Sequence, residues 1–268
     1  MGFQIRNNRL MRYIQEPGVT EISIPEGVTE IHTKAFKKCD SLTRIDIPSS
    51  VTKIGTSAFF RCEALEYLII PEGVEKICAD TFGGCTQLKE ISLPENLFRI
   101  GQNAFDYCKS LEKLVIPDKA EEFGKNMLRG CESLKEVSYR GITFNPQKYD
   151  GVRTDRVLDF IRDRDFSMIM SLSAKHDIIF KLFLNFQDKE AEAYIKSNFA
   201  KMFPLLIRNG DFESIQEILN LHRFVNKRNI DKFIRYAIDR KQHEIYGILL
   251  RYKDQYIGYQ SVEDKFKL

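Results

Sequence analysis

Residues 41–62 read SLTRIDIPSSVTKIGTSAFFRC, and most apolar places in this stretch recur 23 residues earlier and 23 residues later. The cysteine that ends the stretch keeps this step at five positions, Cys39, Cys62, Cys85, Cys108 and Cys131. Proline, leucine, isoleucine and phenylalanine form columns with the same step, although Leu128 takes the fifth place among the phenylalanines. The fixed step predicts a solenoid, because a coil this short must stack on its neighbours to bury its apolar face.

Each repeat divides into three short pieces. Residues 44–47 alternate polar and apolar side chains and are rich in isoleucine, which is typical of a half-buried strand. Pro48 ends this strand because it has no N–H to donate. Residues 51–54 predict a second extended piece, and the residues after Thr56 predict a single helical turn that carries Ala58 and Phe59 inward. Strands of successive coils would stack about 4.8 Å apart, like side chain on like.

This pattern resembles the BspA-type leucine-rich repeat, a bacterial family whose unit is close to L-x-x-I-x-I-P-x-x-V-x-x-I-G-x-x-A-F-x-x-C. Residues 42–62 match every fixed place of that unit, and the resemblance extends over roughly residues 19–139. It implies a solenoid with a parallel sheet on its concave side, and binding of partners on that side. The predicted fold class is α/β: a leucine-rich-repeat solenoid over residues 1–145, followed by an all-α domain.

Both ends of the solenoid show signs of capping. Residues 3–13 alternate around Asn7-Asn8 and predict a hairpin that covers the first coil, so we assign residues 1–18 to an N-terminal hairpin cap. The last repeat departs from the pattern, as expected of an end repeat that faces solvent on one side. The replacements are Ala120, Met127, Leu128, Tyr139 and Arg140.

The cysteine column has three interpretations. A metal site is not predicted, because no C-x-x-C occurs and the four histidines share no ligand spacing with the cysteines. Stacked coils would bring Cα atoms within disulfide range, but five cysteines in one column cannot pair evenly, and a reducing compartment is expected. We therefore predict a ladder of buried thiols that pack behind the phenylalanines.

The outward side chains of the first strands form the candidate binding face. If Ile45 points inward, Arg44 and Asp46 point outward, because side chains alternate along a strand. Most outward positions carry mixed charges, which is typical of a solvated surface, and single exposed apolar residues are ordinary as well. Tyr67, Ile69 and Val115 instead suggest the apolar centre of a protein-binding site with a charged rim. The predicted partner-binding residues are Arg44, Asp46, Tyr67, Ile69, Glu90, Lys113 and Val115.

The 23-residue step disappears in the second half of the chain. Pro146 and Gly151 mark a boundary, and we assign residues 152–268 to an all-α helical domain. Apolar residues at helical spacing predict helices. They are Val157, Leu158 and Ile161; Phe166, Ile169, Met170 and Leu172; Ile178, Ile179, Leu182, Phe183 and Phe186; Ile215, Ile218 and Leu219; and Ile245, Ile248 and Leu249.

A fainter repeat aligns residues 161–169, 207–215 and 238–245. These segments resemble degenerate ankyrin repeats, which implies antiparallel helix pairs. The T-P-L-H start is missing and Lys241 stands where glycine is usual, so the ankyrin register is left open.

Seven basic residues crowd one part of this half. Together with Phe224, Phe233 and Tyr236, they suggest a surface that binds nucleic acid. The favoured interpretation is instead a solvated helix surface whose aromatic rings face the core. The basic residues are Arg223, Lys227, Arg228, Lys232, Arg235, Arg240 and Lys241.

Composition and charge limit the functional classes. The 268 residues are 43% hydrophobic and 29% charged, unlike a disordered chain, and carry a formal net charge of +3. Up to Asp150 there are 20 basic and 21 acidic residues, and after it 21 and 17, so neither half has the charge of a dedicated polyanion binder. Neither a membrane-spanning run nor a signal peptide is seen, and a cytoplasmic location is predicted.

No catalytic motif appears, so the chain is predicted not to be an enzyme and to need neither a cofactor nor a small-molecule substrate. The leading hypothesis is a non-catalytic scaffold that binds a protein or peptide on the concave face. The alternatives are an exported surface-recognition or adhesion protein, which would need a leader from a longer upstream reading frame, and nucleic-acid binding by the basic helices. A third is an enzyme with an unrecognised pocket.

Overall fold

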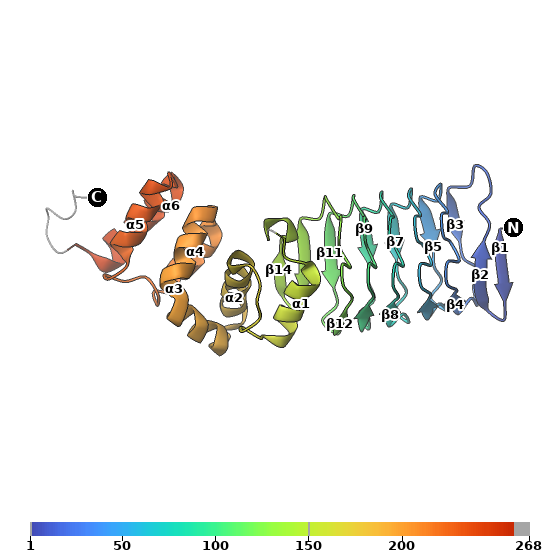
Figure 1. Ribbon diagram of the computed structural model, residues 1–268, viewed down its shortest axis with the longest axis horizontal. Coiled ribbons are helices and arrows are strands. Elements are labelled where there is room, and N and C mark those ends of the chain that lie inside the picture. The colour runs from blue at the N-terminus through green and yellow to red at the C-terminus, as the bar shows by residue number, and fades with distance from the viewer. Residues whose placement is uncertain (1, 150, 260–268) are drawn as a thin grey trace. The chain divides into compact units, whose positions relative to one another are not determined.

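The computed structural model describes residues 2–149 and 151–259, which fall into two compact units, Met1–Ala174 and Lys175–Leu268. The first unit contains the strands and the first helix, α1 (Thr154–Asp163) (Figure 1). The second unit contains only helices among its described residues. The predicted order, a β-solenoid followed by helices, is confirmed.

Two rows of short strands run along the first unit, one strand of each row per coil (Figure 1). The row that carries the predicted binding face consists of a four-stranded parallel sheet continued by a three-stranded one. The four strands are β3 (Glu21–Ser23), β5 (Arg44–Asp46), β7 (Tyr67–Ile69) and β9 (Glu90–Ser92). The three strands are β11 (Lys113–Ile116), β13 (Glu136–Tyr139) and β14 (Ile142–Phe144).

The other row is a seven-stranded sheet, in which all pairings but that of the first two strands are parallel. Ile31, Ile54, Ile77 and Ile100 lie side by side in it, which confirms the 23-residue register. Its strands, in spatial order, are β1 (Phe3–Arg6), β2 (Arg9–Tyr13), β4 (Glu30–Ile31), β6 (Lys53–Ile54), β8 (Lys76–Ile77), β10 (Arg99–Ile100) and β12 (Glu122–Phe123).

The third side of each coil, which we call the turn side, is not the helical turn predicted for it. In the coil of residues 55–62, Ser57 (φ 55°) and Arg61 (φ 58°) are left-handed, so the chain makes short turns in place of a helix. This conformation directs the N–H groups of Ser57, Phe59 and Arg61 to the next coil. They donate to the carbonyls of Ala79, Thr81 and Gly83 over 3.0, 2.9 and 2.8 Å.

The core of the solenoid is built from like columns. The rings of Phe36, Phe59, Phe82 and Phe105 are fully buried and stack with centroids 5.2–5.5 Å apart. The five cysteines of the column are free and buried, which confirms the predicted thiol ladder. Each of the last four donates its S–H to the carbonyl of a phenylalanine in the preceding coil, as Cys85 Sγ does to Phe59 O over 3.2 Å.

A glycine column allows two coils to approach closely. A Cβ atom on Gly101 would lie 2.6 Å from the carbonyl carbon of Cys78 and 2.7 Å from the nitrogen of Ala79, both of which are backbone atoms. Because backbone cannot move aside as a flexible side chain can, we expect Gly101→Ala to lower the free energy of unfolding by about 1–3 kcal/mol, as overpacking does. Urea denaturation of this variant should show the loss. Gly18→Ala has open space around its added methyl group but the strain of a positive φ, and it should cost less.

The caps differ at the two ends. At the N-terminal end, β1 and β2 form the predicted hairpin around Asn7 and Asn8, both left-handed, and β2 pairs with β4 of the first coil. At the C-terminal end, β14 pairs antiparallel with β13. Helix α1 covers β12, because Arg162 of that helix hydrogen-bonds the Glu121 carbonyl and lies over the Phe123 ring.

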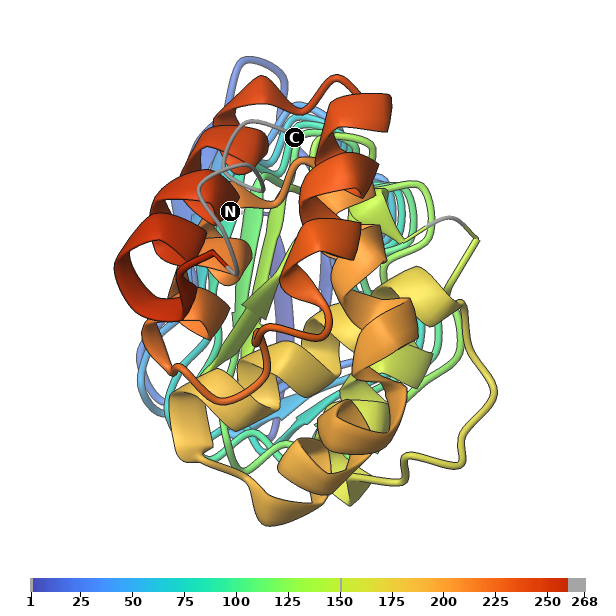
Figure 2. The same ribbon diagram turned by 90° about the vertical axis from the view of Figure 1, so that its left-hand side faces the viewer.

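Helices α3 (Lys189–Asn209), α4 (Phe212–Asn220), α5 (Ile230–Asp239) and α6 (His243–Tyr252) form two hairpins, seen in orange and red in Figure 2. Helix α3 contacts α5, and α4 contacts α6. Gly210 and Lys241 are both left-handed and follow the first helix of each pair, which explains why residues 207–215 and 238–245 look alike. The helix pairs are as predicted, and ankyrin register stays a prediction.

One predicted helical stripe is wrong. Residues 164–171 lie between α1 and α2 (Leu172–Phe186) without helical structure. Arg164 ends α1 in the left-handed conformation, and Asp165 then binds the N–H of Ser167, which holds a turn. Ile169 is consequently 92% exposed, and Leu172 is exposed as well. Two short helices complete the described chain, η1 (Pro146–Lys148) and the π-helix η2 (Lys253–Ile257).

Candidate functional site

The structure places all seven predicted binding residues on one surface of the first unit. Ile45, Leu68, Ile91 and Leu114 are buried below it, because every second side chain of a strand faces the core. We call the exposed side of β3, β5, β7, β9, β11 and β13 the repeat face. The residues exposed on it include Arg44, Asp46, Tyr67, Ile69, Glu90, Lys113 and Val115.

The apolar centre of the repeat face consists of Tyr67, Ile69 and Val115, whose side chains are 52%, 72% and 54% exposed. Tyr67 is paired with Glu90 of the neighbouring strand, and Ile69 with Ser92. The ring of Tyr67 lies beside Lys89, whose Nζ is 5.7 Å from the ring centroid. Tyr67 and Ile69 of β7 and Val115 of β11, with β9 between these two strands, present apolar area on the repeat face that a partner could bury.

The charges around this centre are mostly paired with one another. Arg44 Nε donates to Asp46 Oδ1 over 2.9 Å, and this bond lowers the pKa of Asp46. Lys113 Nζ lies 2.5 Å from Glu136 Oε1 on the next strand. Exposed pairs of this kind add little to stability. They supply a neutralised polar rim, so a partner that covers the centre need not carry a matching net charge.

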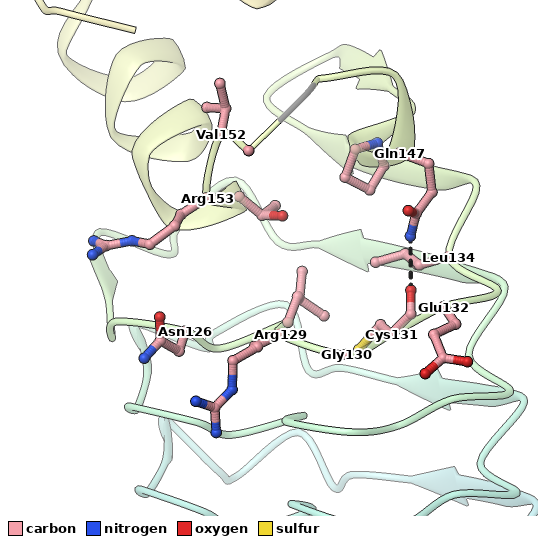
Figure 3. A pocket seen from close by; sticks show the side chains of 13 residues that line it. Asn126, Arg129, Gly130, Cys131, Glu132, Leu134, Gln147, Val152 and Arg153 are labelled. Atoms are coloured by element: carbon pink, nitrogen blue, oxygen red, sulfur yellow. Dashed lines mark hydrogen bonds between the residues drawn. The ribbon is translucent and has the colours of Figure 1, made fainter. Parts of the chain in front are cut away.

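Two hollows at the ends of the turn side were not predicted from the sequence. One, of about 360 Å³, lies beside the last turn-side coil and is bordered by Asn126, Gly130 and Arg153 (Figure 3). Gln147 reaches across it and donates from Nε2 to Cys131 O over 2.9 Å (Figure 3). The other, of about 650 Å³, lies beside the first coil and is bordered by residues 11–15, 33–35 and 37–39. Only the decay of the last repeat, with Leu128 for phenylalanine, hinted at the first.

The basic cluster of the second unit is exposed at all seven positions. Phe224 and Phe233 are buried, in line with the favoured interpretation that these rings face the core. Tyr236 is half-buried, with the Arg240 guanidinium carbon 5.2 Å from its ring centroid. Within residues 2–149 and 151–259, no group of three or more metal-ligating side chains is gathered.

A parallel strand of the repeat face in each coil, a buried leucine in each coil after the first and a constant step define the class of leucine-rich-repeat solenoids. Residues 13–135 match the model of the BspA type leucine rich repeat region in six copies. The repeat region of the chain belongs to this family.

Solved structures of bacterial leucine-rich-repeat proteins are similar to the chain. A leucine rich cell surface protein from Faecalibacterium prausnitzii is 31% identical with a TM-score of 0.50, and the match covers 52% of this chain and 38% of that one. The leucine rich repeat protein of T. pallidum is 34% identical with a TM-score of 0.47, over 51% and 68% of the two chains. One from Bacteroides ovatus is 31% identical with a TM-score of 0.47, over 52% and 41%.

The chain thus spans well under two thirds of the Faecalibacterium protein. A comparison with curated proteins found no match. Of the helices described, none has both the length and the apolar character needed to cross a membrane.

Proposed function

We propose that the protein is a non-catalytic interaction scaffold whose repeat face binds a protein or peptide partner. The observation that carries this proposal is the exposure of Tyr67, Ile69 and Val115 on a surface where the pattern of the strands otherwise places polar side chains. Interfaces commonly have such a centre, in which an aromatic residue is surrounded by a polar rim. The family also supports the proposal, since leucine-rich repeats generally bind proteins.

Tyr67→Ala tests the proposal. Because the Tyr67 ring is half exposed and lies outside the core, the free energy of unfolding should change by no more than about 0.5 kcal/mol. Affinity for a partner captured from the native cell and then purified should fall at least tenfold, or about 1.4 kcal/mol. Isothermal titration calorimetry with the purified pair measures this.

Lys76→Ala is the matched control, because Lys76 is also exposed but belongs to β8 of the other sheet. It should leave the affinity unchanged. Equal loss of affinity in both variants, or in neither, would place the partner elsewhere and refute binding at the repeat face.

The proposed scaffold could act either in the cytoplasm or on the cell surface. A cytoplasmic scaffold is supported by the five buried thiols, which remain free in the structure. A surface-recognition role is supported by the similarity to a protein described as a leucine rich cell surface protein. Cell fractionation followed by protease treatment of intact cells separates the two, since only a surface protein would be cleaved.

Nucleic-acid binding by the basic helices is a weaker candidate. The seven exposed cations support it, whereas the burial of Phe224 and Phe233 removes two rings on which bases could stack. Titration of labelled single-stranded DNA at rising salt concentrations would reveal it, because an affinity carried by phosphate contacts falls steeply with salt.

A further inference from the structure

A row of hydrogen-bond donors runs along the turn side and is left open at its last coil. In each earlier coil, the N–H groups of three alternate residues donate to three carbonyls of the next coil. Asn103, Phe105 and Tyr107 do so to Lys125, Met127 and Arg129, over 3.1, 2.8 and 2.7 Å. The corresponding donors of the last coil belong to Asn126, Leu128 and Gly130. Within the described part of the chain, the backbone N–H of none of these three has a hydrogen-bond partner.

The cap leaves this one side of the coil uncovered. Strand β14 completes the sheet of the repeat face, and α1 covers β12 of the other sheet. On the turn side, the chain instead leaves the 360 Å³ hollow, and all three donor residues border it. Figure 3 shows Asn126 and Gly130 along one edge of the hollow, with Gln147 and Val152 on the opposite side. Its volume is at the lower end of the range of ligand pockets.

The spacing of the three open N–H groups indicates which kind of ligand fits the hollow. In every preceding coil each of the three N–H groups meets a different carbonyl, two residues along the acceptor chain from the next. A small anion could satisfy only one or two of them, whereas a peptide main chain offers carbonyls at that interval. At the other end of the solenoid, main chain meets the turn-side ladder at one carbonyl, because Tyr13 N donates to Ala35 O over 2.8 Å beside the larger hollow.

The charges at the hollow also favour a peptide over an anion. Arg129 is held by both carboxylate oxygens of Asp106, over 2.8 and 2.6 Å, and Arg153 is paired with Asp155. Both guanidinium groups are therefore already neutralised. Leu128, Leu134 and Val152 supply apolar lining for side chains.

We propose that this hollow is a second binding site, which takes a short peptide segment, folded in the turn conformation of the preceding coils, by main-chain hydrogen bonds from Asn126, Leu128 and Gly130. The peptide extends the turn-side ladder by one more coil through main-chain hydrogen bonds, as a strand added to a sheet edge does, but in the turn conformation of this side. The site is separate from the repeat face and does not depend on the function proposed for that face.

Residue-resolved amide exchange on the full chain tests the proposal. In the free protein, the N–H groups of Asn126, Leu128 and Gly130 should exchange at least tenfold faster than those of Asn103, Phe105 and Tyr107. The probe is the blocked heptapeptide GQNAFDY, which copies residues 101–107, because the carbonyls of Gln102, Ala104 and Asp106 accept this ladder within the chain. At millimolar concentration it should slow exchange at the three open positions at least tenfold, and a scrambled peptide should not.

Two variants locate the effect. Thr154→Trp places a large side chain at a residue that borders the hollow and should abolish the protection, whereas Arg156→Trp, exposed on the same helix, should preserve it. Tyr67→Ala on the repeat face should also preserve it. Three outcomes would each overturn the proposal. The three N–H groups could exchange slowly in the free protein, or the heptapeptide could fail to protect them. Protection could also appear without peptide, in a protein that sediments as a dimer.

Discussion

Replacing Phe82 by alanine should lower the free energy of unfolding of the repeat unit by about 3–5 kcal/mol, the usual cost of truncating a buried phenylalanine. The side chain is fully buried, and its ring lies 5.5 Å from that of Phe59 and 5.4 Å from that of Phe105. The cavity would open in the middle of the stack, where neither neighbour can move without losing its own contacts. Urea denaturation followed by circular dichroism measures the loss.

Phe82→Leu is the informative control, because leucine already stands in this column at Leu128. It should cost less than alanine, since much of the buried volume is retained. If Phe82→Ala cost less than about 1 kcal/mol, as surface changes do, the assignment of this column to a continuous core would be wrong.

Raising the pH above 9 should unfold the solenoid before pH 12. Burial raises the pKa of the Cys39 thiol to about 11 and those of Cys85 and Cys131 to about 12, and it raises the pKa values of Cys62 and Cys108 as well. In the unfolded chain these thiols ionise near pH 8.5. Each contributes its full stability below that pH. As the pH rises further, each thiol raises the ratio of unfolded to folded protein roughly tenfold per pH unit, until the pH reaches the pKa of that thiol in the folded state.

Circular dichroism between pH 8 and pH 12 follows this transition. The double variant Cys85→Ala with Cys108→Ala should retain its structure to a higher pH than wild type, because two of the buried groups can no longer ionise. Cys78→Ala, which removes the half-exposed cysteine outside the ladder, should leave the midpoint where it is. Unchanged structure at pH 12 would contradict the burial of the thiols.

The stacked coils were predictable because like residues recur at one step. Ile45 and Phe59 could be placed in the core, and Tyr67 and Ile69 outside it, from alternation alone. The turn side was not predictable in the same way. Its left-handed positions carry asparagine or glycine in some coils, as at Asn103 and Gly84, but serine and arginine at Ser57 and Arg61, so no one residue type marks the positive φ in every coil.

The errors in the helical half have a different cause. Phe166, Ile169 and Leu172 have the spacing of a helix, but the turn set by Arg164 and Asp165 determines the local backbone, and Ile169 is left in solvent. The hollow beside Asn126 could not be predicted either. It arises because the C-terminal cap leaves the turn side of the last coil uncovered, and no pattern of residues in the sequence indicates this.

The equivalence of neighbouring coils also bears on how such a chain can evolve. Any two stretches that begin at corresponding residues of different coils end in the same backbone conformation, so unequal recombination between them would remove or add a whole unit without disturbing a single junction. A version with one coil fewer or more would keep both of its ends. The number of coils is therefore open to selection independently of the sequence within them.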